Sequence, residues 1–326
     1  MRIRLHFFLL IISVILIGIN CNAPRTNPLD PLNPDYNYGT IEGTVQTIGN
    51  PSIAIANVQI LWENANLITE TNAFGRFRLI NIPMEDGKII FSKTGFKSDT
   101  LAVVWGNSKR FISLTFLNRI PTLDTVSIYT SITNEYSQDP ESELFVKAWI
   151  TDLDRDVDSV FIINETLNLK KPLFNPFEGY YLDTLTESDL NVNDIEQTIG
   201  LDFSIMAKDG SDNEFVIGSD RVTRVIKDEV TGLQPSTDSS IIDTTQPVIF
   251  EWNRFEAGYD FNYMIEVYSY NVSSSQLVHS KSNFSSDSTS YTLPQILSDN
   301  NYFWVIWIID EFQNRSRSKP ATFRIQ

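Results

Sequence analysis

The chain has a single cysteine and only two histidines among its 326 residues, and basic residues are outnumbered by acidic ones. One cysteine cannot form an intrachain disulfide or a zinc cluster, and 14 glycines and 14 prolines are too few for collagen or wholesale disorder. The 25 Lys and Arg against 41 Asp and Glu give a net charge of -16, which disfavours nucleic-acid binding because that depends on neutralising phosphates. The 42% hydrophobic content is typical of a globular chain, and the length suggests about two domains.

The N-terminal segment combines a positive start with an apolar run. Arg2 and Arg4 precede residues 5–19, which are almost wholly apolar. This pattern predicts a secretory signal peptide over residues 1–20. A membrane-spanning helix needs roughly 20 apolar residues, so the run is short for a permanent anchor. An uncleaved signal anchor is the alternative.

The only cysteine, Cys21, lies where the apolar run stops. The sequence from Gly18 to Cys21 resembles a bacterial lipobox, although Asn20 stands where Gly, Ala or Ser is commoner. The resemblance implies cleavage before Cys21 and attachment of fatty acyl chains, such as palmitate, to that residue. Several acyl chains give lasting membrane attachment. The alternative is a buried thiol that happens to follow a signal peptide.

The same resemblance implies a location. Asn22 after the cysteine, rather than Asp, fits outer-membrane delivery in a diderm bacterium and leaves open whether the protein faces the periplasm or the cell surface. Processing leaves 306 residues and lowers the net charge from -16 to -18, because Arg2 and Arg4 are lost. Residues 21–37 then form a lipidated linker. Its four prolines predict an extended spacer of about 3 Å per residue; they are Pro24, Pro28, Pro31 and Pro34.

From Tyr38 to Gln326 the sequence predicts an all-β chain. Short alternating or apolar runs are separated by Gly, Asn, Asp, Ser and Pro, and no helix of ten residues or more is indicated. The runs divide best into three tandem β-sandwich domains, over residues 38–117, 118–228 and 229–326.

The first domain shows two clear inward faces. Ile41 and Val45 alternate with polar residues, and Val58, Ile60 and Trp62 do the same on the next strand. The series GTIEGTVQT, NVQILWE, ETNAFGRFRLINIP and KIIFSKTGF resembles the carboxypeptidase regulatory-like domain. That family is a seven-stranded, transthyretin-like sandwich and belongs to a carbohydrate-binding-like fold. The resemblance implies turn and core roles for Asn72, Gly75, Phe77 and Pro83, with Gly75 making a tight turn and Phe77 packing inward.

The second domain carries one strong strand face, followed by an acidic turn and the apolar strand 160–163. Residues 207–215, AKDGSDNEF, predict a late strand end and hairpin turn. The arrangement resembles bacterial immunoglobulin-like or polycystic-kidney-disease-like domains. Residues 167–199 have little pattern that can be assigned. The predicted strand face consists of Leu144, Val146, Ala148 and Ile150.

The third domain is similar to a fibronectin type III domain. Leu297 and Tyr302 have the spacing of a tyrosine corner, in which the phenol bonds back to the chain upstream. Residues 310–318, DEFQNRSRS, match the loop before the last strand, although family members often have Gly where Gln313 stands. The expected core positions are Phe250, Trp252, Tyr263, Ile265, Val267, Tyr302, Trp304, Ile306 and Ile308.

Four aspartates at alternate positions are the one run that suggests metal chemistry: Asp152, Asp154, Asp156 and Asp158. Carboxylates so spaced can converge on a hard cation such as calcium, which would relieve their mutual repulsion. The run is not an EF-hand, because Val157 stands at the sixth position and Ile163 at the twelfth. The alternative is a set of solvated turn aspartates between two strands.

Aromatic residues could form a sugar-binding platform. Trp62 shares the inward face of its strand and is expected in the core. Trp105 lies in the predicted loop 104–109, where exposure would make it a carbohydrate-binding residue; burial is the alternative. Tyr180 and Tyr181 are adjacent, so on a strand they point to opposite faces and at most one is buried.

Catalysis is not expected. After processing, His279 is the single histidine, on a polar stretch where it is expected to be exposed, and no nucleophile elbow, Walker loop or dinucleotide fingerprint is present. The sequence predicts a non-catalytic, membrane-anchored envelope lipoprotein with a structural, adhesive or protein-interaction role. The alternative is a carbohydrate-binding accessory lipoprotein of polysaccharide recognition or uptake. The expected partners are the membrane and an envelope protein or polysaccharide, not nucleic acid; no cofactor is required, and structural calcium is the only one suggested.

Overall fold

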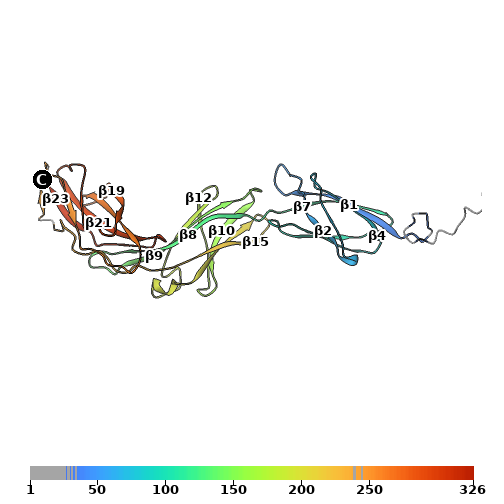
Figure 1. Cartoon of the computed structure of the whole chain (residues 1–326), viewed down its shortest axis with the longest axis horizontal. Coiled ribbons are helices and arrows are strands. Elements are labelled where there is room, and N and C mark those ends of the chain that lie inside the picture. Colours follow the sequence, from blue (N-terminus) through green and yellow to red (C-terminus); the bar gives the residue numbers. More distant parts are fainter. Residues whose placement is uncertain (1–26, 28–29, 31, 34, 238–239, 244) are drawn as a thin grey trace, which may run out of the picture. The chain divides into compact units, whose positions relative to one another are not determined.

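A computed structural model describes residues 27, 30, 32–33, 35–237, 240–243 and 245–326. The regular structure of these residues is almost entirely β-strand, with two short 3-10 helices, which confirms the all-β prediction (Figure 1). The chain divides into two compact units, residues 1–119 and 120–326. The predicted signal peptide and Cys21 lie outside the described residues. Among the described residues, no helix is long and apolar enough to cross a membrane.

The described part of the linker forms turns rather than the expected extended spacer. The backbone N–H groups of Asp30, Asn33 and Tyr36 each donate to the carbonyl three residues earlier, at 2.8–3.0 Å. Every one of these turns begins with Asn or Asp, and proline follows in the sequence, which is the composition that β-turns favour. The last turn is held to the first unit because Lys109 Nζ donates to the Tyr36 carbonyl at 3.0 Å and lies 4.9 Å from the centre of its ring.

The first unit contains seven strands in two sheets, the number that the sequence resemblance implies. The inward faces predicted from alternation are confirmed, since Ile41, Val45, Val58, Ile60 and Trp62 are fully buried. One sheet has the order β4-β1-β7, with β1 (Tyr38–Thr47) antiparallel to β4 (Arg76–Pro83) and parallel to β7 (Arg110–Leu117). The other has the order β3-β2-β5-β6, with β2 (Gln59–Trp62), β3 (Leu67–Glu70), β5 (Gly87–Ser92) and β6 (Asp99–Val103); helix η1 (Glu63–Ala65) joins β2 to β3.

The second unit begins with a sandwich that includes the stretch 167–199, which the sequence left unassigned. The predicted strand face of residues 144, 146, 148 and 150 is buried, as expected. One sheet has the order β11-β10-β14-β15: β10 (Val157–Asn164), β11 (Leu169–Pro172), β14 (Asp202–Asp209) and β15 (Glu214–Arg221). Opposite are β8 (Thr122–Thr133), β9 (Glu141–Thr151), β12 (Phe174–Phe177) and β13 (Tyr180–Thr186), with helix η2 (Ile195–Thr198).

The rest of the second unit is another sandwich, and its nine predicted core residues are all buried. The predicted tyrosine corner is confirmed, since the Tyr302 hydroxyl donates to the Ser298 carbonyl at 3.0 Å. The strands are β16 (Ile241–Ile242), β17 (Ile249–Glu251), β18 (Phe261–Tyr270), β19 (Ser275–Ser285), β20 (Ser290–Thr292), β21 (Asn300–Asp310), β22 (Arg315–Arg317) and β23 (Ala321–Ile325).

The two sandwiches of the second unit share a sheet. Strand β22 pairs in parallel with the end of β8, matching Arg315 to Ser131 and Arg317 to Thr133. A ten-stranded sheet therefore continues from one hydrophobic core into the next. The boundary expected between residues 228 and 229 falls inside this compact unit, so these two sandwiches are joined by backbone hydrogen bonds as well as by the chain.

One turn geometry recurs at four turns between consecutive strands, two of which are hairpins, β14–β15 and β21–β22. In each, the carboxylate or amide oxygens of the first residue accept hydrogen bonds from the backbone N–H groups two and four residues later, at 2.7–3.1 Å. The residue in between, three after the first, has a positive φ. This pattern fixes the turn through a local side chain. The first residues are Asn72, Asp152, Asp209 and Asp310, and the positive-φ residues are Gly75, Arg155, Asp212 and Gln313.

Candidate functional site

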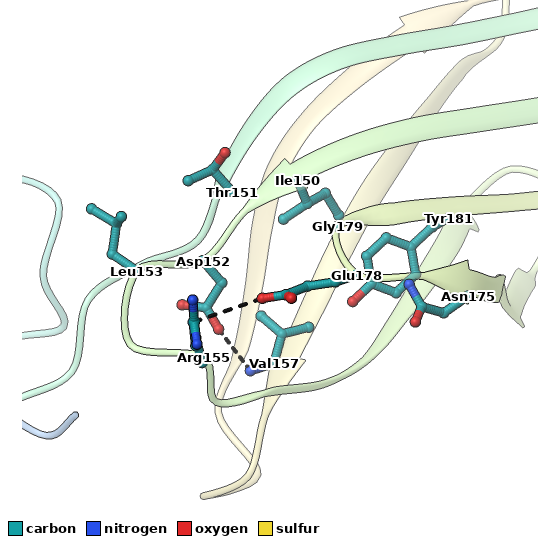
Figure 2. Close-up of a pocket in the computed structure, with 10 residues that line it drawn as sticks. All are labelled: Ile150, Thr151, Asp152, Leu153, Arg155, Val157, Asn175, Glu178, Gly179 and Tyr181. Atoms are coloured by element: carbon teal, nitrogen blue, oxygen red, sulfur yellow. Dashed lines mark hydrogen bonds and ion pairs between the residues drawn. The ribbon is translucent and has the colours of Figure 1, made fainter. Parts of the chain in front are cut away.

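An open cleft of about 590 Å³ lies at one end of the first sandwich of the second unit (Figure 2). It is bounded by the β9–β10 turn and by the β12–β13 hairpin. Polar groups of several kinds converge on it, and Ile150 and Val157 supply an apolar floor. The polar lining residues are Thr151, Asp152, Arg155, Asn175, Glu178 and Tyr181.

The two walls of the cleft are fixed by backbone geometry. Gly179 has a φ of +78°, and a Cβ there would lie 2.9 Å from the Ile150 carbonyl oxygen, so a larger residue would separate the hairpin from β9. The Ile150 N–H donates to the Gly179 carbonyl at 2.8 Å. Asn175 Nδ2 donates to the carbonyls of Phe177 and Tyr180 at 3.0 and 2.9 Å, which closes the hairpin.

Opposite charges meet across the cleft. Arg155 Nε lies 3.7 Å from Glu178 Oε1, and both side chains are more than three-quarters exposed (Figure 2). Ion pairs this exposed contribute little stability, so both groups are available to a ligand. Arg155 reaches this position because it occupies the left-handed position of the recurrent turn, with a φ of +57°.

The acidic run does not form the convergent ligand set that a calcium site needs. The Asp152 carboxylate is turned toward its own loop, where Oδ1 accepts from Asp154 N and Oδ2 accepts from Asp156 N and Val157 N at 2.7–3.1 Å. Asp158 lies in strand β10, on an exposed position. The described residues contain no group of three or more His, Cys, Asp or Glu side chains arranged to hold a metal ion. This corrects the expected geometry, and calcium binding itself stays a prediction.

Asp156 is the titratable group most affected by this arrangement. Burial and, to a smaller extent, the carboxylates of Asp152, Asp209 and Asp154 together raise its pKa from 3.8 to about 6. Its Oδ1 atom is buried and has no hydrogen-bond partner. Tyr181 responds in the same way, since burial and then the Asp152 charge raise the pKa of its phenol. Burial therefore favours the protonated form of both side chains.

The adjacent tyrosines take opposite faces of β13, as expected, but both are half-buried. Tyr181 packs against the core. Tyr180 faces outward beside Trp149 of β9 and Phe177 of β12, with ring centroids 4.6 and 5.0 Å away. The exposed fractions of Trp149 and Phe177 are 45% and 53%.

The sequence alone did not indicate this aromatic cluster, because Phe177 belongs to the stretch without a clear pattern. Tyr180 is inclined by 33° to Trp149 and by 24° to Phe177, and Trp149 and Phe177 also lie 5.6 Å apart at 55°, so the three rings pack as one cluster. A sugar stacks on an open ring face, whereas each of these three rings lies within 5.6 Å of the other two. The geometry is that of a cross-strand ladder that stabilises the hairpin.

Trp105, predicted as a carbohydrate-binding residue if exposed, is buried with an exposed fraction of 5%. Its indole N–H donates to the Glu85 carbonyl at 3.0 Å, and its backbone N–H donates to Asp86 Oδ1 at 3.1 Å. The expected exposure is therefore wrong, because the loop folds back onto the first core. Trp62 is buried as expected.

His279 is half-buried rather than exposed. Its Nε2 atom lies 2.9 Å from the Tyr291 hydroxyl, and the two rings stack with centroids 5.7 Å apart. Burial, with a smaller effect of Lys281, lowers the pKa of the imidazole. His279 of β19 therefore forms a packed aromatic pair with Tyr291 of β20.

No family model matches the chain, and no curated protein matches it. Among solved structures, it is similar to fibronectin(III)-like modules of Clostridium thermocellum CbhA, with 11% identity, a TM-score of 0.30, and coverage of 63% of this chain and 93% of that chain. It is also similar to the FN1-FN3 domains of chicken CNTN1 (11% identity, TM-score 0.31, 84% and 92% covered) and to the Bacillus anthracis TIE protein (10%, 0.24, 89% and 48%). At these TM-scores the likenesses assign neither a family nor a function.

Proposed function

We propose that this protein is a non-catalytic envelope lipoprotein, anchored through Cys21, that presents a binding surface on a stiff pair of β-sandwiches. The observation that carries the proposal is the sheet shared by the two sandwiches of the second unit. A continuous sheet restricts hinge motion, so the cleft at residues 150–181 is held in a fixed orientation on this arm.

The seam between the sandwiches is held by buried polar and aromatic contacts. Asp310, whose side chain is fully buried, pairs with Arg224 Nη1 at 2.7 Å. The Arg315 guanidinium lies 4.9 Å from the ring centres of both Phe145 and Trp307, which belong to different sandwiches. Such contacts fix two elements in one arrangement. They support a role that depends on rigid presentation, such as adhesion or a place in an envelope assembly.

The cleft suits a polar ligand such as a protein loop. It offers a carboxylate, a guanidinium and an amide on a partly apolar floor, which can match the charges and hydrogen bonds of a protein surface. A photo-crosslinking residue at Leu153, a cleft residue that is 65% exposed, should capture a discrete partner in intact envelopes. The same probe at Val216, which is 63% exposed on β15 and does not line the cleft, is the matched control. Equal products from both positions, or none from Leu153, would count against the cleft.

The anchor is tested separately. Cys21→Ser removes the sulfur that the acyl chain requires, so the variant should leave the membrane fraction or accumulate as an unprocessed precursor. Normal processing with normal membrane retention would refute lipidation. Membrane fractionation with and without high salt distinguishes a lipid anchor from electrostatic attachment.

A carbohydrate ligand is the second candidate, and the observation that favours it is the 53% exposure of Phe177 beside the cleft residue Glu178. A glycan array probed with residues 22–326 tests it directly. Binding that Phe177→Ala abolishes, while Phe174→Ala (65% exposed on the same strand) leaves it unchanged, would support a sugar site. A blank array removes this candidate and leaves the protein-binding proposal intact.

A further inference from the structure

Strand β7 of the first unit is the one long, unprotected edge among the sheet ends in the described part of the chain. It forms one end of the sheet β4-β1-β7, and all eight of its residues pair with β1 without a register shift. From Phe111 to Leu117 it contains no charged residue, proline or glycine. Such an edge leaves a row of backbone donors and acceptors ready to pair with another strand.

The other sheet ends carry the protection that natural proteins use against such pairing. Strand β4 has two arginines and Pro83, β15 begins with Glu214 and ends with Arg221, and β19 has Lys281 and two register shifts. The remaining end strands, β3, β6, β11, β12, β16, β17 and β20, have five residues or fewer. The contrast indicates that β7 is kept open for a partner strand.

On β7 three apolar side chains point outward and two hydroxyl side chains point inward, which is the reverse of a strand adapted to water. Ile112, Leu114 and Phe116 point outward, with exposed fractions of 64%, 59% and 43%. Ser113 and Thr115 point inward, and their hydroxyl oxygens are buried without a hydrogen-bond partner. An exposed apolar row and two unpartnered buried hydroxyls each disfavour the unit on its own.

Pairing with β7 of a second copy would cover the apolar row and give the buried hydroxyls partners. The segment FISLTFL permits this because residues equally far from Leu114 on either side are of the same chemical kind. Antiparallel pairing centred on Leu114 places Ile112 opposite Phe116, and Ser113 opposite Thr115, of the other copy. The outer residues of the two copies then form one apolar patch, and each inner hydroxyl meets a hydroxyl with which it can hydrogen-bond.

We propose that this protein forms a two-fold symmetric dimer through antiparallel pairing of β7 with β7 of a second copy, which joins two three-stranded sheets into one. No like charges meet in this register, because Arg110 falls opposite Asn118. Pairing of two short edges buries little surface, so the dimer is expected to dissociate in the micromolar range in solution. The dimer does not depend on lipidation or on the cleft.

Sedimentation of the mature chain with Cys21→Ser, which retains every described residue and has no thiol, tests the dimer. This protein, which is otherwise wild type, should show a monomer–dimer equilibrium. Leu114→Lys, at an exposed side chain, places two ammonium groups opposite each other on the two-fold axis and should weaken the dimer at least about tenfold. Ile80→Lys is the matched control, since Ile80 is 57% exposed on β4, at the other end of the same sheet. A monomer at all concentrations, or equal weakening by both substitutions, would overturn the proposal.

Cross-linking tests the register without relying on a charge. In the same thiol-free background, Ile112→Cys mixed with Phe116→Cys should give a heterodimer with a short bismaleimide, because opposite Cβ atoms lie about 4.5–5.5 Å apart. Leu114→Cys should cross-link to itself, and Ile80→Cys should not. Cross-links that form equally at Ile80, or none at any β7 position, would contradict the proposed pairing.

Discussion

The side-chain amide of Asn314 holds Thr130 at the seam between the two sandwiches of the second unit. Its Oδ1 atom accepts from the Thr130 backbone N–H at 3.0 Å and lies 3.2 Å from the Thr130 hydroxyl. Its Nδ2 atom donates to Asp310 Oδ2 at 3.1 Å and to Thr223 Oγ1 at 3.2 Å. Thr130 and Asn314 are almost completely buried, so one amide satisfies backbone and side-chain groups from both sandwiches.

Asn314→Ala should therefore destabilise the second unit by about 3 kcal/mol, because it leaves the Thr130 N–H and other buried groups without a partner. Denaturant unfolding followed by tryptophan fluorescence measures the loss. Asn271→Ala is the matched control. Asn271 is exposed in the β18–β19 hairpin and accepts only from Ser273 and Ser274, so its removal should cost under about 1 kcal/mol. Equal losses for the two variants would show that the seam adds nothing to stability.

The recurrent turn predicts opposite effects of two substitutions at equivalent positions. Gln313 has a φ of +75°, which disfavours a side chain, so Gln313→Gly should stabilise the second unit by about 0.5–1 kcal/mol. Gly75 has a φ of +69°, and a Cβ there would lie 2.5 Å from the Val45 carbonyl oxygen. Gly75→Ala should therefore destabilise the first unit by about 2–3 kcal/mol. Thermal melting of both variants checks the signs, and a shift in the same direction for both would contradict the shared geometry.

The strand faces could be predicted from the sequence because apolar and polar residues alternate along a strand that buries one face. Every residue of the predicted faces around Val58, Val146 and Trp304 is buried, and the tyrosine corner at Tyr302 is present. The shared sheet could not be predicted in this way. It depends on β8 meeting β22 through polar residues such as Ser131 and Ser316, which carry no pattern that identifies a partner so distant in sequence.

Only one wall of the candidate cleft, the acidic turn, could be predicted from the sequence. The acidic turn was evident, but alternate spacing does not say where carboxylates point, and Asp152 turns toward its own backbone. Glu178 and Tyr181 lie in the stretch without a clear pattern, so their approach to Arg155 could not be foreseen. Trp105 was misplaced because a loop of Gly, Asn and Ser gives no sign that its tryptophan folds back onto the core.

The burial of Trp105 predicts a structural rather than a ligand-binding effect. Trp105→Ala should destabilise the first unit by about 3–5 kcal/mol, because it opens a cavity in the core and leaves the Glu85 carbonyl without its donor. Chemical denaturation of the variant measures this loss. Phe174→Ala removes an exposed aromatic from the second unit and should cost far less. A Trp105→Ala variant that keeps wild-type stability would contradict the packing described for the first core.

Asp156 predicts that part of the stability of the second unit depends on pH. A carboxyl group whose pKa rises from 3.8 to about 6 on folding binds its proton more tightly in the folded state. Its contribution therefore favours folding below about pH 4 and is lost as the pH rises through about 6. At neutral pH the folded protein carries the cost of this ionised carboxylate, which is about 1 kcal/mol after allowance for solvent screening.

Asp156→Asn keeps the shape of the side chain and removes the charge, so it should be more stable than the wild type near neutral pH. The difference should shrink as the pH falls and vanish at about pH 4, where the wild-type group is protonated in the folded state. Urea unfolding of both proteins across this range measures it. Asp139→Asn, at an exposed loop position, removes the same formal charge and isolates the effect of net charge. A stability gain that is constant with pH, or that Asp139→Asn reproduces, would mean that the partly buried cluster of Asp152, Asp156 and Asp209 is not its source.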